Sequence, residues 1–205
     1  MLTTERRKPG WLLYPGWVVL SALSIPLAWG ITWVVISQIE KVIGGTILVG
    51  GQTRITEDYL ASFVLFPLLG LFTGLLQYLI LRRYLPGMGW WIAATALSWL
   101  VPIGVLRLVY FLLPTGLAVD SILLNALLIA LMGSLIGLIQ WLVLRKHVRQ
   151  AGWWILACAV GWGLVFLVTG PSISSTLDVV VVALLPPLVT CLALWALLDW
   201  LPRRD

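Results

Sequence analysis

The chain has few charged residues and a single histidine, and these shortages exclude several kinds of site. Only 10% of its 205 residues are Asp, Glu, Lys or Arg, whereas a soluble domain carries about 25%. The lone His147 excludes paired histidines for haem or a metal ion within the apolar segments. No lysine lies inside an apolar run, which excludes a retinal Schiff base. We therefore expect neither a cofactor nor a metal site.

The apolar segments also lack the groups that catalysis requires. They contain no pair of carboxylates for acid and base work and no serine with a histidine partner. No Walker loop or dinucleotide-binding fingerprint is present. Cys158 and Cys191 lie in different apolar runs at different depths, so we expect buried unpaired thiols. The sequence predicts that the protein is not an enzyme.

Most residues of the chain are apolar. They make up 61% of the chain, and the mean hydropathy is +1.04. Each long run approaches the roughly 20 residues that cross a hydrocarbon core about 30 Å thick, and continuous apolar runs satisfy their backbone amides as helices. We expect one all-α integral membrane domain over residues 1–205 with six transmembrane helices, at about 17–36, 61–81, 90–113, 121–144, 153–169 and 179–200.

The basic residues predict an orientation. Ten of them fall on the side that holds both termini, whereas only Lys41 and Arg54 fall in the opposite loops. The positive-inside rule then places both termini in the cytoplasm. These residues form short pairs beside the predicted spans, so they fit a lipid bilayer as the partner and not nucleic acid. The ten are Arg6, Arg7, Lys8, Arg82, Arg83, Arg145, Lys146, Arg149, Arg203 and Arg204.

An internal repeat organises the chain. Seven identities recur at an offset of 63 residues, and they define units at about 66–112 and 129–170. Each unit holds two spans and restores the starting orientation, which makes the repeats parallel and not inverted. A third unit split between the two ends would close a pseudo-threefold ring. Its faint first half is Ala196–Arg204, and its second half sets Trp17 against Trp91 and Ser24 against Ser98. The identities are Gly70/Gly133, Gly74/Gly137, Gln77/Gln140, Arg82/Arg145, Trp90/Trp153, Trp91/Trp154 and Trp99/Trp162.

Each unit carries a stripe of small residues that ends in a glutamine. Gly70, Gly74 and Gln77 share one helical face, as do Gly133, Gly137 and Gln140. Such glycines predict close helix packing. Gln77, Gln140 and Asp199 then have two interpretations. They bond to neighbouring helices in a dry seam, or they form a polar collar around a vestibule.

Four tryptophans and one arginine lie at positions that predict a role in the membrane. Trp90, Trp91, Trp153 and Trp154 stand where a helix re-enters the bilayer, so we expect them to be interfacial anchors. Arg107 is the one charge inside a predicted span. It reaches the outer boundary, pairs with Asp120 or Asp178, or lines an anion path. Residues 38–60 form the longest loop, and we expect an amphipathic or hairpin cap there.

The segment GLIQWLVLRKHVRQAGWWILACAVGW resembles a pattern found in uncharacterised bacterial multipass membrane proteins. Those proteins carry repeated G-L-x-Q-W-L-V-L-R units followed by A-x-W-W and a later G-W. The match is best at Gly137 to Trp162 and good at Gly74 to Trp99. The resemblance implies a bacterial inner membrane and supports the repeat, but it implies no activity.

Two functions remain open at this stage. The first is a non-catalytic scaffold or accessory subunit that packs with itself or with a larger membrane complex through its glycine stripes. The second is a small transporter or channel in which Gln77, Gln140, Asp199 and Arg107 line a central path for a small solute, ion or lipid. The direction in which the glutamines face discriminates between them.

Overall fold

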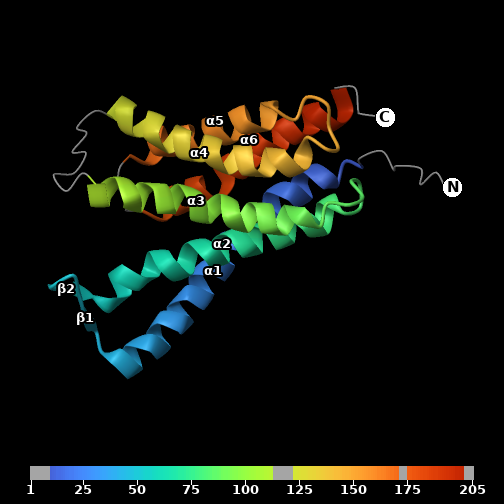
Figure 1. The fold of residues 1–205 in the computed structure, drawn as a ribbon. Helices are drawn as coiled ribbons and strands as arrows, with labels where there is room; N and C mark the ends of the chain where they lie inside the picture. The colour runs from blue at the N-terminus through green and yellow to red at the C-terminus, as the bar shows by residue number, and fades with distance from the viewer. Residues whose placement is uncertain (1–9, 113–121, 171–174, 201–205) are drawn as a thin grey trace.

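The computed structural model describes residues 10–112, 122–170 and 175–200 as a helical bundle with one small hairpin (Figure 1). The elements in chain order are α1 (Leu13–Ile43), β1 (Thr46–Val49), β2 (Gln52–Ile55), α2 (Thr56–Leu81), α3 (Trp90–Leu112), α4 (Ile122–Leu144), α5 (Trp153–Thr169), α6 (Thr176–Trp195) and a π-helical turn, η1 (Ala196–Trp200).

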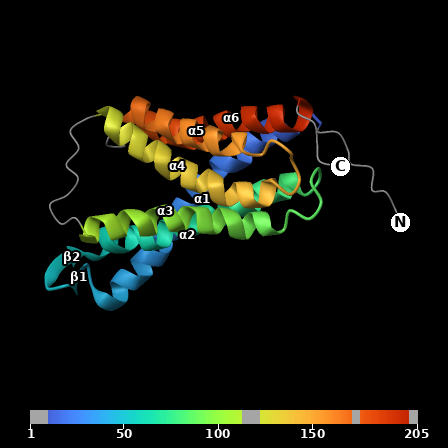
Figure 2. The ribbon, with the colours of Figure 1, turned by 45° about the horizontal axis from the view of Figure 1, so that its top comes forward.

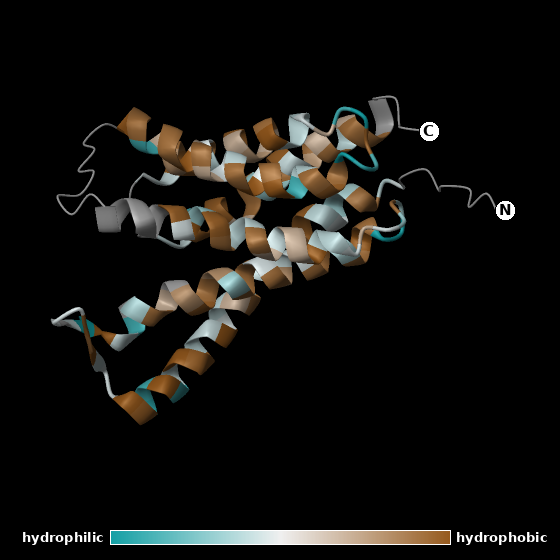
Figure 3. Ribbon diagram, viewed as in Figure 1, coloured by the Kyte–Doolittle hydropathy of each residue, from teal (hydrophilic) through white to brown (hydrophobic). Residues whose placement is uncertain are grey.

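Within the described residues every apolar run is helical, and the predicted segment 153–169 has the same bounds as α5. α1 extends beyond the predicted 17–36 at both ends and α2 begins before residue 61, so the predicted loop 38–60 is helical at both of its ends. Among the described residues, four segments are long and apolar enough to cross a membrane, namely Leu13–Ile43, Tyr59–Leu81, Ile122–Leu144 and Thr176–Leu198. The apolar stretches Trp90–Val105 and Trp153–Thr169 are shorter. Hydrophobic residues recur along the helices (Figure 3). The chain is an all-α protein with the features of a membrane protein.

The six helices contact one another in a closed sequence. Each packs against the next along the chain, and α6 packs against α1. Two views show the first and last helices side by side (Figures 1 and 2). Helices at opposite ends of the chain are therefore neighbours in space.

A β-hairpin joins α1 to α2, where the sequence predicts a cap. Thr46 pairs with Ile55 and Val49 with Gln52 in antiparallel register. The two-residue turn consists of Gly50 and Gly51, which have φ values of 58° and 79°. A turn with both central φ values positive matches the twist of the flanking strands, and glycine adopts it without a steric penalty.

The main core lies at the opposite end of the bundle. We call this the turn end, because it holds the connections 82–89 and 145–152, and we call the other the hairpin end (Figure 1). The hydrophobic core cluster there includes Leu13, Leu81, Leu144, Leu194 and Leu198 from α1, α2, α4, α6 and η1. His147 links the two turns through a contact of 2.9 Å between its Nε2 and the carbonyl oxygen of Pro86.

Candidate functional site

Three tryptophans from three different helices meet in the centre of the ring. Trp17 on α1, Trp91 on α3 and Trp154 on α5 are at most 1% exposed. Their ring centroids are 6.2, 5.7 and 5.8 Å apart, and every pair is edge-on. Edge-to-face contacts place the positive edge of one ring on the negative face of the next, which makes them favourable. We call these residues the tryptophan triad.

Each indole of the triad donates its N–H to a side chain on the helix beside it. Trp91 Nε1 donates to Gln77 Oε1 at 3.1 Å, and Trp154 Nε1 donates to Gln140 Oε1 at 2.9 Å. Trp17 Nε1 donates to Thr190 Oγ1 at 3.2 Å. A buried indole N–H is costly without an acceptor, so these three acceptors hold the triad in place.

The glutamine amides extend the network to further helices. Gln77 Nε2 donates to Ser21 Oγ on α1 at 3.0 Å, and Gln140 Nε2 donates to Thr95 Oγ1 on α3 at 3.2 Å. Each glutamine is at most 6% exposed. One side chain thus joins α2 to both α1 and α3, and the other joins α4 to both α3 and α5.

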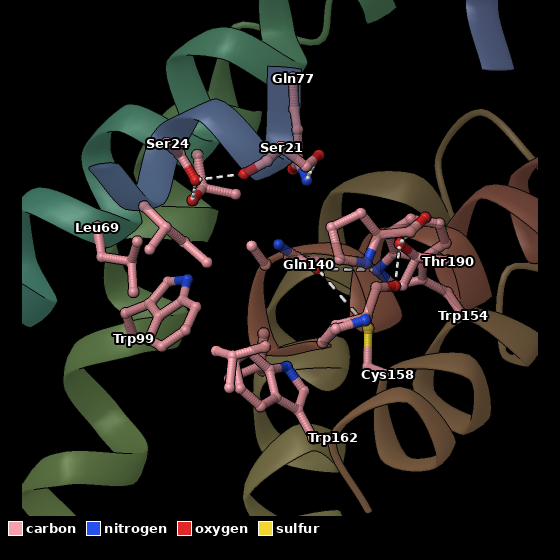
Figure 4. A pocket seen from close by; sticks show the side chains of 17 residues that line it. Ser21, Ser24, Leu69, Gln77, Trp99, Gln140, Trp154, Cys158, Trp162 and Thr190 are labelled. Atoms are coloured by element: carbon pink, nitrogen blue, oxygen red, sulfur yellow. Dashed lines mark hydrogen bonds between the residues drawn. The ribbon is translucent and has the colours of Figure 1, made fainter. Parts of the chain in front are cut away.

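A cavity lies on the hairpin side of the tryptophan triad, and all six helices contribute to its lining. Its volume is about 70 Å³, which suffices for a few water molecules at about 10–15 Å³ each. The polar part of its wall includes Ser21, Ser24, Thr73, Gln77, Gln140 and Thr190, and Trp154 also lines it (Figure 4). We call it the central cavity.

The four stripe glycines lie in helix contacts within the chain. A Cβ at Gly70 would come 2.9 Å from the Ala96 Cα on α3, and one at Gly74 would come 3.0 Å from the Ile92 oxygen. At Gly133 the Cys158 oxygen on α5 would be 2.6 Å away, and Gly137 would meet the Ile155 Cα at 2.9 Å. Because the glycines are covered by α3 and α5, these stripes do not present a surface to a partner protein.

Gln77 and Gln140 reach the same cavity, but their hydrogen bonds run across helices. Both interpretations of these glutamines hold in part. Each amide bonds to a neighbouring helix, as a seam requires, and each also lines the central cavity, as a polar collar requires. Asp199 lies in η1, and its side chain falls outside the described residues. The indole of Trp17, the third member of the triad, donates to Thr190.

The tryptophan pairs divide between two environments. Trp90 and Trp153 are 73% and 58% exposed, whereas Trp91 and Trp154 are 0% and 1% exposed. The prediction that all four are interfacial anchors is therefore wrong for Trp91 and Trp154. Neighbouring helix positions differ by about 100° in direction, so the two indoles of a pair point in different directions and can meet different surroundings.

Arg107 lies within α3, and its side chain is outside the part of the chain that the structure describes, as is Asp120. Asp178 forms a capping box with Ser175 at the start of α6. Its carboxylate accepts a bond from the Ser175 amide at 2.8 Å. The proposed pairing of Arg107 stays a prediction.

The sequence interpretation set Trp17 against Trp91 and Ser24 against Ser98 but did not predict that Trp17 and Ser24 belong to a site, and it missed Thr190, Ser21 and Thr73. A signal was present, because Trp17, Ser21 and Ser24 on α1 have the same spacing as Trp91, Thr95 and Ser98 on α3. Spacings of four and three residues put each set on one helical face. All six residues of the two sets are buried.

Comparison of the chain with protein-family models, with curated proteins and with solved structures gives no match.

Proposed function

We propose that this protein is a non-catalytic integral membrane scaffold or accessory subunit, which packs with itself or with a larger membrane complex. In this proposal all six helices span the inner membrane of a bacterium, and both termini are cytoplasmic. The turn end is then the cytoplasmic end, because Arg82, Arg83, Arg145 and Lys146 follow α2 and α4 there.

The proposal includes three parallel two-helix repeats in a pseudo-threefold ring. Three equivalent indole bonds support it, since Thr190 takes the part of Gln77 and Gln140. The next buried position also agrees: Leu194 follows Thr190 by four residues, as Leu81 follows Gln77. The split unit is thus α6 with α1. Its first half is better aligned on Thr190 than on the segment Ala196–Arg204.

One observation supports the scaffold function: the polar side chains at the centre of the ring form hydrogen bonds with one another. The bonds of Gln77, Gln140 and Thr190 connect α1 to α2 and α6, and α3 to α2 and α4. Hydrogen bonds between helices add stability in a bilayer, by about 0.6 kcal/mol each on average. A body tied together in this way suits a fixed structural role. Its partner surface must be the outer face of the ring, because the glycine stripes are covered.

Photocrosslinking in the native membrane tests this function. Benzoylphenylalanine is placed singly at exposed positions around the ring, namely Trp33, Leu71, Leu131, Leu167 and Leu192. We expect a discrete protein adduct, with a second copy or one defined subunit, at neighbouring positions on one side. The buried Trp17 is the control and should give no adduct with another chain. Lipid adducts alone at all five positions would overturn the scaffold proposal.

The central cavity favours a second candidate, a path for a small solute. Such a path requires the tryptophan triad to separate, because its packed rings close the cavity on the turn side. Single cysteines at Gln77 and Gln140, with Cys158 and Cys191 replaced, report on this. Labelling by an impermeant reagent from the cytoplasm would support the path, whereas protection from that side supports the scaffold.

A further inference from the structure

A second cavity adjoins the central cavity, and the two share the side chains of Trp99, Ile136 and Trp162. It lies mainly between α3 and α4, with Phe66, Ile103, Ile129 and Met132 in its wall. Its volume is about 170 Å³, and every side chain that lines it is apolar. We call it the apolar chamber.

Trp99 and Trp162 form the boundary between the two spaces. Their rings meet edge-on with centroids 5.3 Å apart, and Phe66 stacks on Trp99 at 6.1 Å. The two cavities are therefore separated by side chains, namely these two indoles and Ile136. A ligand that occupies both spaces requires these side chains to rotate.

The two spaces differ in chemistry. The central cavity has hydroxyl and amide groups in a wall that is otherwise apolar, and none of its lining residues is Asp, Glu, Lys, Arg or His. A charged ligand would find no counter-charge there, and burial of an unpaired charge is strongly unfavourable. The site therefore fits a neutral molecule. Each glutamine amide has two N–H groups, and the hydrogen bonds to Ser21 and Thr95 use one on each.

The apolar chamber is matched to a ring or a short alkyl chain. A dry cavity of about 150 Å³ lined by apolar side chains is large enough to bind benzene. Ile103, Ile129 and Met132 are only half-buried, so the chamber reaches the outer face between α3 and α4. A ligand dissolved in the bilayer could enter there without crossing water.

We propose that the central cavity and the apolar chamber together bind a neutral amphiphile. Its oxygen atom accepts hydrogen bonds from Gln77 or Gln140, and its ring or chain lies in the apolar chamber beside Trp99 and Trp162. Alcohols, ketones and esters that partition into lipid belong to this class. This site goes beyond the scaffold function and does not depend on it.

Fluorine NMR on the purified full-length protein in detergent tests the site. The probes are 4-(trifluoromethyl)benzyl alcohol and 4-(trifluoromethyl)toluene, which differ by one hydroxyl group. We expect a saturable bound signal for the alcohol and an affinity about tenfold lower for the toluene, after correction for partition into detergent. The factor follows because the toluene makes no hydrogen bond to the amide groups.

Two variants on α4 locate the binding. Ile129→Trp fills the apolar chamber and should weaken binding of the alcohol at least tenfold. Leu131→Trp adds the same group at an exposed position of the same helix and should leave binding unchanged. Met132→Phe replaces the first variant if Ile129→Trp fails to fold, as judged by circular dichroism and gel filtration.

Three results would overturn the proposal. Equal affinity for the two probes would mean that the polar groups do not recognise the ligand. The absence of saturable binding would mean that the cavities hold water or nothing. An equal loss in Ile129→Trp and Leu131→Trp would place the probe elsewhere. The crosslinking outcome for the scaffold is independent of all three.

Discussion

Trp17 and Thr190 lie 173 residues apart in sequence and are joined by a hydrogen bond of 3.2 Å from the indole Nε1 to the hydroxyl Oγ1. The Thr190 hydroxyl also donates to the Pro186 carbonyl at 2.8 Å, an oxygen that belongs to the Pro-Pro segment of α6. This bond fixes α6 against α1. It is the point at which the two ends of the chain complete the ring.

The amide of Gln140 should be needed for stability. Gln140→Leu leaves the Trp154 N–H buried without its acceptor and Thr95 without its donor. We expect the free energy of unfolding to fall by about 1–3 kcal/mol, measured by denaturant titration in detergent. Gln150→Leu, at an exposed turn position, is the control and should change little. A loss no larger than that of Gln150→Leu would contradict the role of the network.

Trp90 and Trp91 should contribute very differently to the stability of the fold. Trp91→Ala removes a fully buried ring from the triad, and such truncations cost about 3–5 kcal/mol. Trp90→Ala removes an exposed ring from the adjacent position and should cost less than about 1 kcal/mol in detergent. Thermal unfolding of both variants gives the comparison. Equal destabilisation would show that Trp91 does not belong to a packed core.

A methyl group at Gly133 should separate α4 from α5. Its Cβ would lie 2.6 Å from the Cys158 carbonyl oxygen and 2.9 Å from the Trp162 Cβ. Because the backbone must shift, we expect Gly133→Ala to cost about 1–3 kcal/mol. Gly104→Ala on α3 meets nothing within 4 Å and should be neutral or slightly stabilising. If thermal unfolding shows the two variants equally stable, the close helix contact is absent.

The sequence predicts the helices well, because the length and hydropathy of a run are local properties. The bounds of α5 agree at both ends, and those of α3 and α4 agree within one residue, whereas α1 and α2 extend beyond the predicted 17–36 and 61–81. The orientation of an indole is not local. Trp90 and Trp91 are chemically identical, and only the orientation of α3 in the ring, which brings Trp91 against Trp17 and Trp154, decides which one is buried.

The sequence predicts only the part of the candidate site in which the same residue type is repeated. Gln77 and Gln140 are evident because the residue type recurs at one offset. Thr190 performs the same task with a different side chain, so residue identity does not reveal it. Its role depends on α6 lying beside α1, a contact between the two ends of the chain.

Closure of the ring between α1 and α6 is tested most directly by crosslinking Tyr14→Cys to Cys191. The Cys191 Sγ lies 3.5 Å from the backbone oxygen of Tyr14, and Cys158→Ala removes the other thiol. A protease site inserted in the Gly50-Gly51 turn separates the chain into two fragments after oxidation in the membrane. Val19→Cys, at an exposed position of α1, serves as the control. The account predicts that the fragments stay covalently joined for Tyr14→Cys and separate for Val19→Cys. Separation in both variants, with each protein intact before cleavage, would contradict a closed ring.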